Sequence, residues 1–116
     1  MPDRPFSIAD LETLRQWDVP TICNGLEIVM PERRAIGFTV EPMIAVDPKA
    51  PPIAGLARTG TIRAKEPPRG KVADRTEWYD YVATADLTTV VVLQDIDHPA
   101  GYGAYWGEVQ SNVHKA

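Results

Sequence analysis

The first hydrophobic positions of the chain recur at helical spacing. Ile8, Leu11 and Leu14 form an apolar stripe, which predicts an amphipathic helix. Ser7 can accept hydrogen bonds from the first turn, and Asp10 lies at the reciprocal capping-box position. The sequence therefore predicts a helix that opens at Ser7.

A second run of apolar residues lies between two prolines. Ile22, Leu26 and Val29 occupy positions i, i+4 and i+7, and Pro20 suits a first helical turn. Pro31 ends the pattern because proline cannot continue a helix. We expect a second helix between these prolines.

The middle of the chain is rich in β-branched and small residues instead. Residues 36–40 (IGFTV) and 56–62 (LARTGTI) are each predicted to form a short strand. Residues 65–75 carry charges, prolines and a glycine, and are predicted to form a loop.

Helical spacing returns once before a further strand. Trp78, Val82 and Ala85 form a third stripe, and residues 88–93 are rich in β-branched side chains with no alternation. Such a pattern is typical of a strand covered on both faces. A helix followed by a buried strand and then by another helix predicts an α/β fold in which at least part of the sheet is parallel.

The segment after that strand carries the strongest candidate site. Ligands of open α/β sheets bind beyond the carboxyl ends of the strands, and residues 94–103 form the loop that leaves this end. Gly107 would let backbone come close to an anion, and Glu108 could carry a proton. An ordinary helix start explains the same pair, with Glu108 complementing the helix dipole. The helix itself is predicted by an apolar stripe at Val109, Val113 and Ala116.

Three neighbouring residues form a candidate cation site. Asp95, Asp97 and His98 could offer ligands to a hard metal ion. Asx turns ahead of Pro99 explain the same residues without a metal, because aspartate side chains accept hydrogen bonds from backbone two residues later. The sequence leaves both interpretations open.

Four other charged or reactive side chains have simpler roles available. Arg58 and Arg63 lie on or near a predicted strand, where either could bind a carboxylate ligand or reach solvent or an ion pair. His114 is most simply a surface residue of the last helix, and Cys23 is most simply a small buried hydrophobe of the second.

Composition argues against several classes of protein. The formal net charge is −4 with no run of basic residues, which argues against binding driven by nucleic-acid phosphates. The single cysteine allows no intrachain disulfide, and no apolar stretch is long enough for a signal peptide or a membrane span. We expect a cytoplasmic protein.

Several short motifs, taken in order, resemble one family. Residues 17–27 (WDVPTICNGLE) resemble the opening helix motif of the RraA-like proteins, which include regulators of ribonuclease activity and 4-hydroxy-4-methyl-2-oxoglutarate aldolases. Residues 37–40 and 57–62 resemble the next two strands of that family. Residues 89–93 and 107–110 resemble its strand and glycine-led helix at the substrate site.

The resemblance implies a fold and an assembly. The fold is the swivelling β/β/α (phosphohistidine-domain-like) arrangement, of which residues 1–116 would be the N-terminal portion of a single domain. No helix-stop signal follows the last apolar stripe, so the C-terminal portion is expected to be absent from this sequence. The family assembles as trimers or hexamers with active sites at subunit interfaces.

The resemblance also implies an activity. The complete protein would be a divalent-metal lyase, a class II pyruvate aldolase that uses Mg²⁺ or Mn²⁺ and cleaves 4-hydroxy-4-methyl-2-oxoglutarate-type 2-oxo acids to pyruvate. Oxaloacetate decarboxylation is its expected second activity. The alternatives are a non-catalytic regulator that binds a ribonuclease or another protein, and an inactive fragment.

The site residues follow from the same resemblance. Gly107, Glu108, Val109 and Gln110 would hold the pyruvate part of the substrate through backbone N–H groups, and Glu108 would transfer a proton through water. The family's metal-anchoring aspartate and a substrate-binding arginine match no residue here and are expected beyond Ala116.

Overall fold

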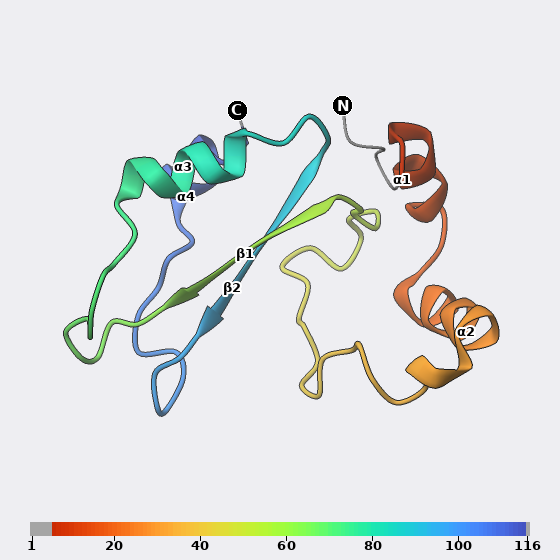
Figure 1. Cartoon of the computed structure of the whole chain (residues 1–116), viewed down its shortest axis with the longest axis horizontal. Coiled ribbons are helices and arrows are strands. Elements are labelled where there is room, and N and C mark those ends of the chain that lie inside the picture. Colours follow the sequence, from red (N-terminus) through yellow and green to blue (C-terminus); the bar gives the residue numbers. More distant parts are fainter. Residues whose placement is uncertain (1–5, 116) are drawn as a thin grey trace. The chain divides into compact units, whose positions relative to one another are not determined.

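A computed structural model describes residues 6–115 of the chain (Figure 1). These residues divide into two compact units, and the boundary falls between Ala54 and Gly55. The single domain over residues 1–116 stays a prediction. No helix in the described part is long and apolar enough to cross a membrane.

The first helix, α1 (Ile8–Leu14), begins where its capping residues predict. The Ser7 hydroxyl accepts a hydrogen bond from the Asp10 backbone N–H at 3.2 Å, and the Ser7 N–H donates to the Asp10 carboxylate at 2.7 Å. Leu11, at 5% exposure, is the one buried hydrophobic side chain in the described part of the chain. The capping box therefore fixes the start of α1, while its packing rests on a single position.

The second helix, α2 (Val19–Val29), also confirms its prediction. The Asp18 side chain accepts a hydrogen bond from the Thr21 backbone N–H at 2.9 Å, and Pro20 occupies the first turn. A short 3₁₀ helix, η1 (Pro31–Arg33), follows directly. Ile28 is 80% exposed, so much of the apolar surface of α2 remains in contact with solvent.

The strand predicted over residues 36–40 does not form, and this prediction is wrong. Residues 34–54 are turns and irregular backbone. Ala35 has a φ of +66° and Gly37 a φ of +89°, and both values bend the backbone away from an extended path. The β-branched composition was correct for a strand, but no neighbouring strand pairs with this segment.

The second unit is a strand–helix–strand arrangement. Strand β1 (Leu56–Ile62) and strand β2 (Thr89–Asp95) lie side by side in parallel, with Leu56 opposite Thr89 and Ile62 opposite Asp95. Helix α3 (Arg75–Ala83) connects them (Figure 1). The predicted loop over residues 65–75 is confirmed up to the first residue of α3. The chain therefore belongs to the α/β class, as the sequence predicts.

One face of this sheet packs on α3. A side chain at Gly60 would meet both the Trp78 ring of α3 and the Leu93 side chain of β2, so Gly60 and Leu93 share that face. Val92 points to the opposite face because side chains alternate along a strand, and it is 39% exposed. The prediction that this strand is covered on both faces is therefore wrong, since a single helix layer leaves the second face open to solvent.

The last helix, α4 (Glu108–Val113), begins after Gly107 as predicted. Ala116, the final position of its predicted stripe, lies outside the described residues. In α3 the stripe at Trp78 and Val82 is helical, whereas Ala85 lies just beyond the last turn.

Acid should weaken the caps of the second unit. The backbone N–H of Thr76 lowers the pKa of Asp74, and the N–H of Asp97 lowers the pKa of Asp95. Each lowered pKa means that folding favours the charged carboxylate, so the stabilisation is complete above about pH 4 and is lost as the pH falls through the lowered values. We expect helical circular dichroism to decline in that acid range.

The control is Asp74→Asn, because asparagine caps a helix as well as aspartate but does not titrate. This variant should keep its helix at neutral pH and lose less of it in acid. An unchanged acid profile would show that the Asp74 carboxylate contributes nothing to the transition.

Candidate functional site

The predicted substrate segment, residues 107–110, is mostly exposed. Gly107 has an extended backbone with a φ of −162°, and a side chain added there would meet nothing within 4 Å. Neither backbone strain nor packing therefore requires a glycine. Glu108 is exposed, and Val109 is 71% exposed. Gln110 is half-buried, and its side-chain oxygen accepts a hydrogen bond from the Tyr79 hydroxyl at 3.1 Å.

A groove of about 1110 Å³ lies at the carboxyl ends of β1 and β2, and we call it the carboxyl-end groove. The end of β1, the residue after β2, the first turn of α3 and one residue of α4 all contribute to it: Ile62, Arg63, Asp74, Arg75, Ile96 and Gln110. Of the four predicted substrate residues, only Gln110 lines it. Glu108 lies between lining residues Tyr105 and Gln110 in the sequence but does not itself line the groove.

Basic side chains outnumber acidic ones in this groove. Its lining contains Arg63, Arg69, Lys71 and Arg75 against Glu66, Asp74 and Glu77. Arg69 pairs with Glu66 at 2.8 Å, and Lys71 lies 3.8 Å from Glu77. Arg75 makes no ion pair with any described residue, so its guanidinium is free to bind an anion.

The Asp95 carboxylate forms a turn, as the second interpretation of this cluster predicts, whereas the Asp97 carboxylate bonds to backbone far away in the sequence. Asp95 accepts hydrogen bonds from the backbone N–H groups of Asp97 at 2.9 Å and Gly101 at 2.6 Å. Asp97 is 4% exposed and accepts from the N–H groups of Ala64 and Lys65 at 2.8 and 3.0 Å. Asp97 therefore ties the end of β1 to the loop after β2.

The described residues do not provide a binding site for a divalent cation. Within residues 6–115, no three histidine, cysteine, aspartate or glutamate side chains come together in a way that could hold a metal ion. The oxygens of Asp95 and Asp97 are already engaged by backbone N–H groups.

The two strand arginines behave differently from one another. Arg63 lies 3.8 Å from Glu66 and 3.9 Å from Asp97, in agreement with the ion-pair interpretation. The Arg58 guanidinium packs over the Tyr81 ring at 4.7 Å, and its Nε is buried without a hydrogen-bond partner in the described part. Cys23 was predicted to be a buried hydrophobe, and its side chain is half-buried, so it is more exposed than predicted.

His114 is not a simple surface residue, and that prediction is wrong. Its ring contacts four aromatic rings with centroid separations from 5.1 to 6.3 Å: those of Trp78, Tyr79, Tyr105 and Trp106. We call this group the His114 cluster. Burial there raises the pKa of the Tyr105 hydroxyl. The cluster links α4 to α3 and to the loop that precedes α4.

Both ring nitrogens of His114 are engaged. The Trp78 indole N–H donates to His114 Nε2 at 3.0 Å, and His114 Nδ1 lies 2.8 Å from the carbonyl oxygen of Gln110. Because Nε2 accepts, Nδ1 carries the proton and donates, which assigns the neutral Nδ1–H tautomer. The i, i+4 spacing of Gln110 and His114 was visible in the sequence, but the four aromatic partners were not.

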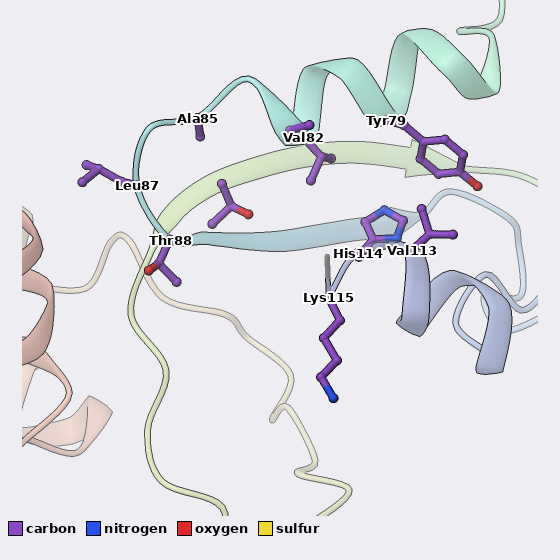
Figure 2. A pocket seen from close by; sticks show the side chains of 10 residues that line it. Tyr79, Val82, Ala85, Leu87, Thr88, Val113, His114 and Lys115 are labelled. Carbon is purple, nitrogen blue, oxygen red and sulfur yellow. The ribbon is translucent and has the colours of Figure 1, made fainter.

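A second cavity of about 390 Å³ was not predicted, and we call it the α3–α4 cavity. It is bounded by the end of α3, the segment leading into β2 and the end of α4 (Figure 2). Figure 2 shows Val82 directed from α3 toward the sheet, with Val113 and His114 at the end of α4. Sequence patterns could not find it because its walls come from three separate segments.

Comparison of the chain with protein-family models, with curated proteins and with solved structures finds no match. The resemblance to the RraA-like proteins rests on the short motifs alone and stays a prediction.

Proposed function

We propose that the chain is part of a lyase that cleaves small 2-oxo acids to pyruvate, as the motif resemblance implies. The observation that carries the proposal is the carboxyl-end groove, which lies where α/β sheets bind ligands and contains Arg75, a cation with no ion pair to the described residues. A 2-oxo acid presents a carboxylate, which an arginine can bind through two parallel hydrogen bonds.

Residues of the carboxyl-end groove and of the Gly107–Gln110 segment would have separate roles in binding and proton transfer. Arg75 would bind the substrate carboxylate, and Arg63 would add positive charge at the end of β1. The segment from Gly107 to Gln110 would hold the pyruvate part from the margin of the groove. Glu108 is exposed and would exchange a proton with the substrate through water.

Three further features belong to the same proposal. The complete fold would be the swivelling β/β/α arrangement, the protein would assemble as a trimer or hexamer, and it would be cytoplasmic. The resemblance implies Mg²⁺ or Mn²⁺ as the cofactor of the complete protein. Because the described residues make no site for the cation, only substrate binding and proton transfer are assigned to this chain.

Glu108→Ala tests the proposal. We expect pyruvate release from 4-hydroxy-4-methyl-2-oxoglutarate or oxaloacetate, measured with Mg²⁺ or Mn²⁺ present, to fall about 100-fold in this variant, since a positioned acid or base contributes that much. The protein is assayed as its gene encodes it. Glu41→Ala is the matched control, because Glu41 is an exposed glutamate outside both cavities. No metal-dependent turnover of either acid by the unaltered protein would refute the lyase.

A non-catalytic regulator is the second candidate, and the exposed apolar side chains favour it. Ile28 of α2 and Val92 of β2 both contact solvent in the described structure. Apolar surface of this kind is commonly covered by a protein partner. Sedimentation of the protein with a purified ribonuclease from the same organism should then give a stoichiometric complex, whereas independent sedimentation would remove this candidate.

A further inference from the structure

The α3–α4 cavity has apolar walls over most of its lining. Val82 comes from α3, Leu87 from the segment that leads into β2, and Val113 from α4 (Figure 2). Its volume of about 390 Å³ lies near the lower limit of small-molecule sites, which span about 300–1000 Å³. A ligand for this space is therefore small and carries an apolar body.

The polar groups of the cavity favour an anionic head on that ligand. The Thr88 and Thr89 hydroxyls and the Lys115 ammonium have no side-chain hydrogen bond or ion pair with the described residues. No aspartate or glutamate is among the residues that line the cavity. The lining of the cavity thus offers hydroxyl donors and one cation without a carboxylate among its described residues, unlike the carboxyl-end groove.

The remaining polar residues of the cavity are already engaged. The Tyr79 hydroxyl donates to Gln110, and both nitrogens of His114 have protein partners. These two residues therefore present ring surface to a ligand. Lys115 lies at the rim, with its ammonium extending outward (Figure 2). An anionic head at the rim would remain partly hydrated while the apolar body fills the interior.

We propose that the α3–α4 cavity binds a small apolar monocarboxylate, such as an aromatic or a short branched aliphatic acid. The carboxylate meets the Lys115 ammonium and the threonine hydroxyls, and the body packs against Val82, Leu87 and Val113. This site is separate from the carboxyl-end groove, and the proposal does not depend on the lyase.

Amide ¹H–¹⁵N spectra of the protein titrated with benzoate test the site. We expect saturable shifts at Val82, Thr88 and Val113, and weaker or no shifts with benzamide, which has the same ring without the charge. Lys115→Gln should weaken benzoate binding about fivefold, the expected loss for one partly hydrated ion pair. Lys49→Gln is the matched control, because Lys49 is exposed and lies outside both cavities.

Ala85→Leu supplies the complementary variant by filling the cavity from its wall. It should abolish the benzoate shifts while Lys115→Gln only weakens them. Equal binding of benzamide and benzoate, or unaltered benzoate binding in Lys115→Gln, would overturn the proposal. Shifts of the same resonances with protein concentration alone would assign the cavity to a second copy of the chain instead, and this too would overturn it.

Discussion

Gly60→Ala should destabilise the second unit by about 2 kcal/mol. A Cβ atom at this position would lie 2.9 Å from Cζ3 of Trp78 and 3.1 Å from Cδ2 of Leu93. Neither neighbour can retreat easily, because Trp78 is held by its hydrogen bond to His114 and Leu93 belongs to β2. Overpacking of this kind typically costs 1–3 kcal/mol, and about 2 kcal/mol corresponds to roughly a 30-fold change in the ratio of folded to unfolded protein. Urea denaturation measures the difference.

Gly107→Ala provides the matched control for this substitution. The same methyl group added at Gly107 meets nothing within 4 Å, and its extended backbone suits any residue. We expect a loss below about 1 kcal/mol, which reflects only the weaker capping by alanine. Equal losses in the two variants would mean that the contact of β1 with α3 at Gly60 is not close-packed.

His114→Ala should have the largest effect, about 3 kcal/mol. The substitution leaves the half-buried Trp78 indole N–H without its acceptor, and a donor left unsatisfied inside a protein costs about 1–3 kcal/mol. It also removes ring contacts with four aromatic side chains, each of which adds a fraction of a kcal/mol. Because α4 is tied to α3 through this ring, we expect α4 to detach. Urea denaturation and the chemical shift of the Trp78 indole proton report the two effects.

Two further variants separate the contributions. His114→Phe keeps an aromatic ring but loses both hydrogen bonds, and its stability should fall between those of the unaltered protein and His114→Ala. His98→Ala replaces the other histidine, whose side chain is exposed, and should leave the stability unchanged. A loss in His98→Ala as large as in His114→Ala would contradict a specific role for the His114 cluster.

Local signals predicted the helices and strand β1. The caps at Ser7 and Asp18 act within three residues of the chain, so the sequence alone determines where α1 and α2 begin. The predicted strand over residues 36–40 failed for the opposite reason. Its composition suits a strand, but a strand requires a pairing partner, and pairing is not encoded in the segment itself.

The candidate sites show the same division. Sequence placed a site at the carboxyl end of a strand, where the structure has a groove, but only Gln110 of the four predicted substrate residues lines it. The His114 cluster and the α3–α4 cavity escaped prediction because their members are separated along the chain and meet only after α3 and α4 pack. Tertiary contacts, which no local pattern reports, decide both.

The open surroundings of Gly107 have a consequence for selection experiments. Variants at a sterically demanding glycine are depleted whether selection acts on abundance or on activity. At Gly107 the two selections should diverge, because small substitutions leave the folded protein intact. If Gly107 variants keep normal protein abundance but are depleted when selection acts on activity, this backbone position is functional, and that result requires no knowledge of the substrate.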